Sequence, residues 1–234
     1  MKNKYLDFLA LFGVGGAHPG GLPLTEELLQ KEQIHPDTRI LDIGCGTGQT
    51  AFFLVQTFGC KVTAVDKHPL MIEKTKNRFQ QDLSCVTIVQ GDAENLEFED
   101  ESFDIVISES VVSFTTISQT LPELFRVLKP GGRLIMIEMT AAQPLSKEEQ
   151  KDVFDLYGVQ KVLCEDEWKE YVTKAGFQLT EVNQTPFEPG ANEVPEFSPS
   201  DHIDKEYYDI WLQHTAYSIH SNNPLVCRIY RCTK

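Results

Sequence analysis

Residues 39–50 constrain the fold of this chain more than any other stretch. They read Arg-Ile-Leu-Asp-Ile-Gly-Cys-Gly-Thr-Gly-Gln-Thr. The apolar run over 40–43 is typical of a central strand in a parallel sheet. Three glycines follow at every second position, and glycine permits both a positive φ and the close approach of a ligand. A helix that begins after this turn directs its free N–H groups toward it. We therefore predict a ligand site at the carboxyl end of strand 40–43 in an open α/β sheet.

The spacing of these glycines separates two classes of nucleotide-binding protein. Dinucleotide-binding dehydrogenases carry G-x-G-x-x-G, whereas this chain has G-x-G-x-G preceded by an aspartate. The string D-x-G-x-G-x-G resembles motif I of class I S-adenosylmethionine (SAM)-dependent methyltransferases. The resemblance implies that this turn binds SAM through Asp42, Gly44, Cys45, Gly46 and Gly48. A strand–helix turn without a ligand is the alternative for this motif taken alone.

A second acid lies at the end of the next expected strand, 61–66. Asp66 follows Gly48 by 18 residues, a spacing that suits a carboxylate bound to both hydroxyls of a ribose. It resembles motif II of the same family, where this acid binds the SAM ribose, and the resemblance places its neighbour Lys67 in the same site. The alternative is that Asp66 caps the helix expected over 69–80.

A third acid follows the strand expected over 85–89, in the string Gly-Asp-Ala. In the family, the aspartate at this place accepts a hydrogen bond from the adenine amino group, and the next backbone N–H meets the ring. The resemblance assigns these roles to Asp92 and Ala93. The alternative is an ordinary turn, because Gly-Asp is a common turn pair.

The fourth expected strand, 103–108, ends beside the expected methyl group. Its string Ser-Phe-Asp-Ile-Val-Ile-Ser resembles motif IV of the family, and Glu109 follows it directly. Glu109 is a candidate for orienting the acceptor, taking its proton or binding the ammonium group of the cofactor. Capping of the following helix is the structural alternative. The string Leu-Lys-Pro-Gly-Gly-Arg-Leu before the fifth strand, 133–138, is a further family mark, in which we expect the glycines to form a turn.

The N-terminal segment is expected to cover the site. Residues 2–12 form an amphipathic helix pattern, and a glycine-rich loop over 13–21 contains His18. In the family this region often folds over the cofactor, which makes His18 a candidate general base or substrate contact. The alternative is a solvent-exposed loop histidine. Thr25 precedes two glutamates and is expected to be the N-cap of the next helix.

The fold class that follows is α/β, a Rossmann-like, doubly wound, seven-stranded sheet whose last strand is antiparallel. An N-terminal cover and a C-terminal helical insertion are added to it. We expect one methyltransferase domain over 1–234. Its parts are a cover (1–34), a SAM-binding core (35–184), an insertion or lid (185–224, with a loop over 185–203 and an aromatic helix over 204–220) and a last strand (225–234). The family usually joins its last two strands by a short turn, so an insertion this long is expected to be functional or to form a partner surface.

Composition excludes several functions. The net charge of −14 disfavours binding to nucleic acid, which needs a basic face, and to an anionic membrane surface. We see no transmembrane stretch. The six cysteines show no metal-binding spacing, so we expect no metal and reduced thiols in a cytoplasmic protein, monomeric or homodimeric.

The expected function is methyl transfer from SAM to a small-molecule acceptor, with S-adenosylhomocysteine as product. Proximity and orientation supply most of the catalysis in such a reaction. The acceptor site is expected from four regions, namely 13–21, 109–115, 146–157 and 204–220. The aromatic stripe in the last region, Tyr207, Trp211 and Tyr217, either lines this pocket or packs a lid or dimer surface. A SAM-binding protein without transfer activity is the alternative function.

Overall fold

The computed structural model describes residues 3–80, 84–159, 161–185, 196–218 and 223–234. In chain order the elements are α1 (Lys4–Phe12), β1 (Val14–Gly15), α2 (Gly21–Gln30), β2 (Arg39–Ile43), α3 (Gln49–Phe58), β3 (Lys61–Asp66), α4 (Pro69–Arg78), β4 (Val86–Gln90), β5 (Phe103–Glu109), a 3-10 turn η1 (Val112–Phe114), α5 (Ile117–Val127), β6 (Leu128–Ala141), α6 (Lys147–Tyr157), α7 (Glu165–Lys174), β7 (Gln178–Thr185), β8 (Glu196–Phe197), α8 (Lys205–Ser218) and β9 (Leu225–Thr233).

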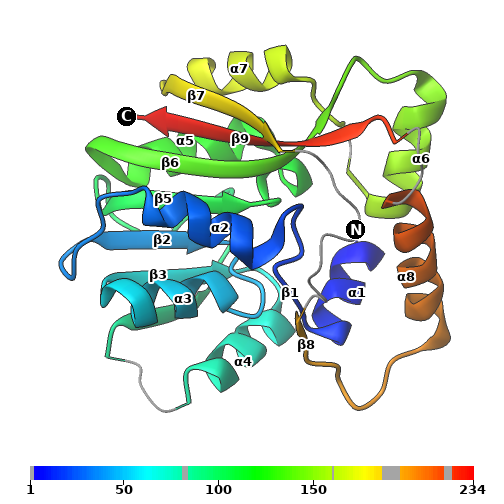
Figure 1. Ribbon diagram of the computed structural model, residues 1–234, viewed down its shortest axis with the longest axis horizontal. Coiled ribbons are helices and arrows are strands. Elements are labelled where there is room, and N and C mark those ends of the chain that lie inside the picture. Colours follow the sequence, from blue (N-terminus) through cyan, green and yellow to red (C-terminus); the bar gives the residue numbers. More distant parts are fainter. Residues whose placement is uncertain (1–2, 81–83, 160, 186–195, 219–222) are drawn as a thin grey trace.

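Seven strands form one sheet in the order β4-β3-β2-β5-β6-β9-β7. The first five run parallel, and β9 pairs antiparallel with both β6 and β7 (Figure 1). The expected Rossmann-like sheet with an antiparallel last strand is therefore confirmed. Ile43 at the end of β2 pairs with Val65 of β3 and Ser108 of β5. Asp66 and Glu109, each the next residue on its strand, consequently lie on the two sides of the motif I turn.

The apolar run of β2 packs on both faces of the sheet. Ile40 belongs to a cluster that includes Leu54 of α3. Leu41 is in a second cluster, which includes Leu124 of α5 and Trp168 of α7. Each of these side chains is less than 2% exposed, and such burial contributes about 1.5–3 kcal/mol for each large aliphatic residue. The turn after β2 is thus fixed at the centre of the molecule.

A third apolar cluster lies beside the carboxyl ends of the parallel strands, where α1, α6 and α8 come together (Figure 1). Tyr5 of α1 stands edge-on to Tyr157 of α6, with ring centroids 4.8 Å apart. The Asn3 side chain caps α1 by accepting from the backbone N–H of Tyr5 and Leu6, and its amide donates to the Tyr157 carbonyl at 2.9 Å. The N-terminal segment is thereby attached to the C-terminal half of the chain.

Three expectations about local structure are wrong. The helix expected to start at Thr25 begins at Gly21, which places Thr25 inside α2. The fifth strand begins at Leu128, because the expected turn at 131–132 is an irregularity within β6, with Gly131 at φ +76°. The expected loop 185–203 contains β8, which pairs with β1. Parts of the expected loop 185–203 and of the helix 204–220 lie outside the described residues.

Candidate cofactor and active site

The motif I turn is shaped so that only its middle glycine faces open space. All three glycines have positive φ, and Gly46 is at +55°. A Cβ added to Gly44 would lie 2.3 Å from Val111, and one added to Gly48 would lie 2.6 Å from Thr75. A Cβ at Gly46 would meet nothing within 4 Å. Packing therefore explains two of the glycines, and the third leaves room for a ligand against the backbone.

Asp66 is held in place by backbone donors. The Gly46 N–H donates to its Oδ2 at 2.9 Å, and the His68 N–H donates to its Oδ1 at 2.8 Å. Burial raises the pKa of Asp66. Each carboxylate oxygen accepts two hydrogen bonds, so acceptor capacity remains for hydroxyl groups. The alternative role as a helix cap belongs to His68, whose Nδ1 accepts from the Leu70 N–H at the start of α4.

Asp92 and Lys67 contact each other at the ends of neighbouring strands. Lys67 Nζ donates to Asp92 Oδ2 at 2.6 Å, and the Glu94 N–H donates to Asp92 Oδ1 at 3.1 Å. Burial raises the pKa of Asp92, but these hydrogen bonds outweigh it and the pKa is lowered overall. The Asp92 carboxylate is therefore an ionised acceptor, followed directly by the backbone of Ala93.

Asp42 is a buried acid without a matching cation. It is 2% exposed, and its Oδ2 has no hydrogen-bond partner within the described part of the chain. Burial raises its pKa, and the negative charges of Glu109 and Asp66 raise it further. An unpaired buried acceptor is costly. Three acids at one sheet edge therefore create a site that favours a positively charged ligand, and SAM carries both an ammonium and a sulfonium group.

Glu109 and His18, which the sequence offered as separate candidates, lie next to each other. Glu109 Oε2 accepts from Thr50 Oγ1 at 2.6 Å, and its Oε1 accepts from Thr25 Oγ1 and lies 3.4 Å from His18 Nε2. The His18 side chain is only 3% exposed, so the alternative of an exposed loop histidine does not apply. His18 Nδ1 lies 3.2 Å from the Pro19 carbonyl. A carbonyl only accepts, so Nδ1 carries a hydrogen, and Nε2 lies 3.2 Å from Thr25 Oγ1 and faces Glu109.

Two residues of this site were not found from the sequence. Thr25, expected as a helix cap, is 1% exposed and donates to Glu109 from within α2. Glu138 of β6 is fully buried and accepts from the Val112 N–H at 2.9 Å and from Ser113 Oγ at 2.6 Å. Burial raises the pKa of Glu138 to about 7. An acid that ends an apolar strand is the only sequence signal of this second residue.

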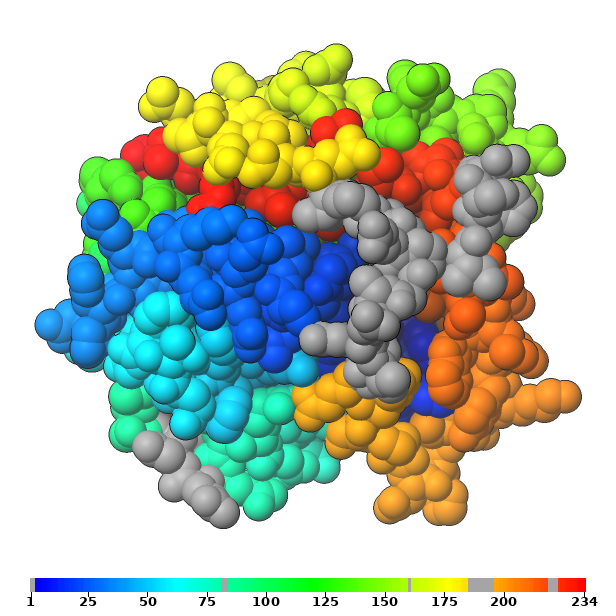
Figure 2. All heavy atoms as spheres, viewed as in Figure 1, coloured from blue at the N-terminus to red at the C-terminus, as the bar shows by residue number. Residues whose placement is uncertain are grey.

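The segment around β8 lies across the motif I turn. Glu196 Oε2 accepts from Arg78 at 2.7 Å and from Gln49 at 3.1 Å. Arg78 also donates to the Thr47 carbonyl at 2.8 Å. The Ser198 N–H donates to backbone carbonyls of the N-terminal segment, and residues 196–200 lie at the surface in Figure 2. Segments from the two halves of the chain therefore cover one edge of the sheet.

The expected acceptor regions divide into two groups. The loop 13–21 contacts Glu109 through His18, and the segment after Glu109 donates backbone hydrogen bonds to Glu138. The described residues of α6 and α8 pack instead against α1: His214 Nδ1 lies 3.1 Å from the Tyr157 hydroxyl, and Trp211 stands edge-on to Phe12. For the aromatic stripe, these contacts agree with the packing alternative.

Comparison with known proteins defines the class. A model of the methyltransferase domain matches residues 41–136. A Bacillus subtilis (strain 168) protein named uncharacterized methyltransferase YodH is 43% identical over 217 residues, covering 91% of each chain. The ubiquinone/menaquinone biosynthesis C-methyltransferase UbiE of Ruegeria sp. (strain TM1040) is 36% identical over 126 residues, 52% of this chain and 49% of that one.

A solved structure shows the same fold. Haemonchus contortus phosphoethanolamine N-methyltransferase 2 in complex with S-adenosyl-L-methionine aligns with a TM-score of 0.76 at 20% identity, covering 98% of this chain and 56% of that one. The sheet order and the site at its carboxyl edge define a methyltransferase fold. The chain belongs to the class I SAM-dependent methyltransferase family, whose methyl donor is SAM.

No group of three or more side chains among the described residues is arranged to hold a metal ion. None of the helices that the structure describes combines the length and apolar character needed to cross a bilayer.

We expect the Asp66→Ala variant to bind SAM more weakly by about 1–3 kcal/mol, because the charged acceptor predicted for the ribose hydroxyls is lost. Isothermal titration with SAM measures this change. Asp104→Ala is the matched control, since Asp104 also accepts from a backbone N–H, that of Arg39 at 2.8 Å, but lies at the opposite edge of the sheet. Equal SAM affinity in the Asp66 variant and the wild type would contradict the ribose assignment.

Proposed function

We propose that this protein transfers a methyl group from SAM to a small-molecule acceptor, with Glu109 and His18 at the reacting end of the site. The observation that carries the proposal is the buried contact between these two residues. Glu109 ends a strand beside the motif I turn, and His18 belongs to the N-terminal cover. This contact supports the proposal, because it brings a side chain of the cover to the carboxyl end of the strand that resembles motif IV.

We assign each group of residues at the carboxyl edge to one part of SAM. The Gly44–Gly48 turn, with Cys45 in it, and Asp42 hold the amino-acid portion, and Asp66 holds the ribose. Asp92 and the Ala93 N–H hold the adenine, with Lys67 fixing the Asp92 carboxylate at 2.6 Å. The buried, unpaired Asp42 Oδ2 and the open space at Gly46 support this fit. SAM, when bound, supplies an activated methyl group on a sulfonium.

The chain contributes orientation and a place for one proton. The proton of the acceptor is assigned to the Glu109–His18 pair, whose Oε1 and Nε2 atoms lie 3.4 Å apart, so that the loss of either partner removes this place for the proton. Thr25 and Thr50 each donate to Glu109 and so fix the direction of its carboxylate. The remaining catalysis comes from holding the acceptor in line with the methyl group.

Several observations support a small acceptor. Described segments of both halves of the chain lie across the sheet edge that carries the site, which suits an acceptor small enough to be enclosed between them. The net charge of −14 disfavours nucleic acid. Two proteins compared above are named for small substrates, one methylated at carbon and one at nitrogen.

The test begins with isothermal titration of ligand-free protein with SAM and S-adenosylhomocysteine. Release of S-adenosylhomocysteine is then assayed with amines and with phenolic quinone precursors. For an acceptor that is turned over, we expect His18→Gln to lower kcat by roughly 10²–10⁴-fold, with SAM affinity close to that of the wild type. Asp104→Ala serves as the control for folding.

Two outcomes would contradict methyl transfer, and a third would contradict only the role of His18. Folded protein that binds neither ligand would remove the assigned cofactor site. Tight SAM binding without turnover of any acceptor class would instead favour a SAM-binding protein without transfer activity. An unchanged kcat in His18→Gln would move the proton acceptor to another residue while leaving methyl transfer intact.

A further inference from the structure

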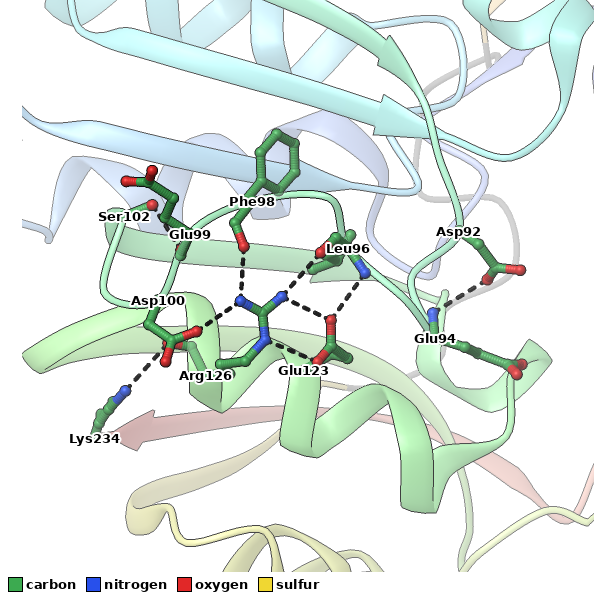
Figure 3. Close-up of polar contacts among 10 residues, drawn as sticks. All are labelled: Asp92, Glu94, Leu96, Phe98, Glu99, Asp100, Ser102, Glu123, Arg126 and Lys234. Carbon is green, nitrogen blue, oxygen red and sulfur yellow. Dashed lines mark hydrogen bonds and ion pairs between the residues drawn. The ribbon is translucent and has the colours of Figure 1, made fainter.

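The turn that joins β4 to β5 is held by side chains of α5 that lie away from the cofactor site. This turn, residues 91–102, carries Asp92 and Ala93 and contains no helix or named strand. Figure 3 shows the Arg126 guanidinium of α5 at its centre, with carbonyl and carboxylate oxygens of the turn directed toward it. A turn of this length without regular structure is otherwise free to change conformation.

Arg126 contacts three separate residues of the turn. Its Nη2 donates to the Leu96 carbonyl at 2.9 Å, and its Nη1 donates to the Phe98 carbonyl at 2.7 Å and to Asp100 Oδ1 at 2.9 Å. The turn contacts the same residue in return, because the Glu101 N–H donates to the Arg126 carbonyl at 3.0 Å. The rigid fork of a guanidinium suits this use, since a lysine cannot reach several acceptors in one plane.

Glu123, one helical turn before Arg126, also binds the backbone of Leu96. Its Oε2 accepts from the Leu96 N–H at 2.9 Å, and its two oxygens accept from Arg126 Nε and Nη2 at 2.9 and 2.8 Å. Leu96 is thus held through its N–H by one side chain and through its C=O by the other. The Leu96 side chain is 5% exposed and packs with Leu121 and Leu124 of α5.

Glu94 links the start of α5 to Asp92, the residue assigned to adenine. Glu94 Oε1 accepts from the Thr116 N–H at 2.8 Å, at the start of α5, where a negative charge is favourable. The Glu94 N–H donates to Asp92 Oδ1 at 3.1 Å. The same helix therefore holds the turn at both its beginning and its middle.

We propose that Arg126 and Glu123 are positioning residues for adenine recognition, which hold the turn in the conformation that presents Asp92 and the Ala93 N–H. The inference rests on the adenine role proposed for those two residues. A turn that is ordered before binding does not have to be ordered by the ligand, so affinity for the adenosyl group is higher.

The test compares Arg126→Gln with the wild type by titration with S-adenosylhomocysteine and with S-inosylhomocysteine, in which an oxo group replaces the adenine amino group. We expect the Kd for S-adenosylhomocysteine to rise roughly 5–30-fold and the preference over the inosine analogue to shrink. Arg126→Lys should restore part of both. Turnover at saturating SAM should stay within about twofold, because the methyl end of the site is unchanged.

Arg228→Gln is the matched control, because Arg228 of β9 forms a comparable ion pair, at 2.6 Å, with Glu165 of α7, and neither element belongs to the 91–102 turn or to α5. We expect it to lower the melting temperature and to leave both dissociation constants unchanged. If Arg126→Gln does not fold, Glu123→Gln replaces it, since that change weakens only the contact with the Leu96 N–H and the pairing with Arg126.

A lower melting temperature with unchanged ligand preference in the Arg126 variant would overturn the inference and leave a purely structural role. Asp92→Ala is measured in parallel. If that variant also keeps the preference for adenine, the inference falls because the adenine assignment itself is wrong. If Asp92→Ala loses the preference and Arg126→Gln keeps it, the assignment stands and only the positioning role is lost.

Discussion

Substitution of Gly46 by valine is expected to abolish SAM binding, with a Kd raised by more than ~100-fold. The backbone of Gly46 has φ +55°, and nothing lies within 4 Å of an added Cβ. The new Cβ therefore meets no described atom of the protein, but the side chain enters the space assigned to the cofactor. A β-branched residue at positive φ also adds strain of about 1–3 kcal/mol. Isothermal titration on folded protein measures the effect.

Gly59→Val separates strain from lost cofactor space. Gly59 ends the same helix that Gly46 precedes, has φ +63°, and likewise has nothing within 4 Å of an added Cβ. The two variants should therefore lose similar stability in urea unfolding, while only the Gly46 variant loses SAM binding. Normal binding by a folded Gly46 variant would show that the turn does not lie against the cofactor.

Removal of the Glu138 carboxyl is expected to lower the free energy of unfolding by about 2–5 kcal/mol. In Glu138→Ala, the backbone N–H groups of Val111, Val112 and Ser113 lose a buried acceptor. Val111 packs against Gly44, so the segment after β5 should also loosen its contact with motif I. Urea unfolding followed by circular dichroism gives the stability, and a loss below about 1 kcal/mol would show that water replaces the carboxyl.

The same carboxyl should make stability depend on pH. Its pKa in the folded protein is about 7, above the ordinary value of 4.5, so the folded state favours the protonated form. The stability of the wild type relative to Glu138→Gln should then be greatest below pH 4.5. It should decrease as the pH rises to about 7 by at most roughly 3 kcal/mol, and stay constant above. A difference that grows with pH would mean that Glu138 is ionised when the protein folds.

The fold and the position of three acids at the carboxyl edge of the sheet were predictable because their signals are local. Asp42, Asp66 and Asp92 each lie at or just after a strand that the apolar pattern identifies, and parallel strands bring their carboxyl ends to one edge. The rest of the site depends on contacts between distant residues. Thr25 meets Glu109 across 84 positions, and no pattern around Thr25 distinguishes this role from a helix cap.

Pairing between very short strands could not be predicted from the sequence for a similar reason. β1 and β8 are two residues long, which is too short for any periodicity to appear. The pairing of β1 with β8 depends on the packing of the surrounding helices. An example is the contact of Phe12 of α1 with Tyr208 and Trp211 of α8. Sequence reasoning finds strands that carry their own pattern, and it misses strands that form because their neighbours bring them together.

The place of β9 between β6 and β7 has a consequence for synthesis on the ribosome. β7 ends at Thr185 and β9 begins at Leu225, some 40 residues later. At 5–20 residues per second, the ribosome takes roughly 2–8 s to reach β9, the only strand that pairs with β7 among the described residues. The five parallel strands can assemble during that time, because all of them precede β7 in the chain. The carboxyl edge of the five parallel strands can therefore form in the nascent protein before β9 is added and the sheet is complete.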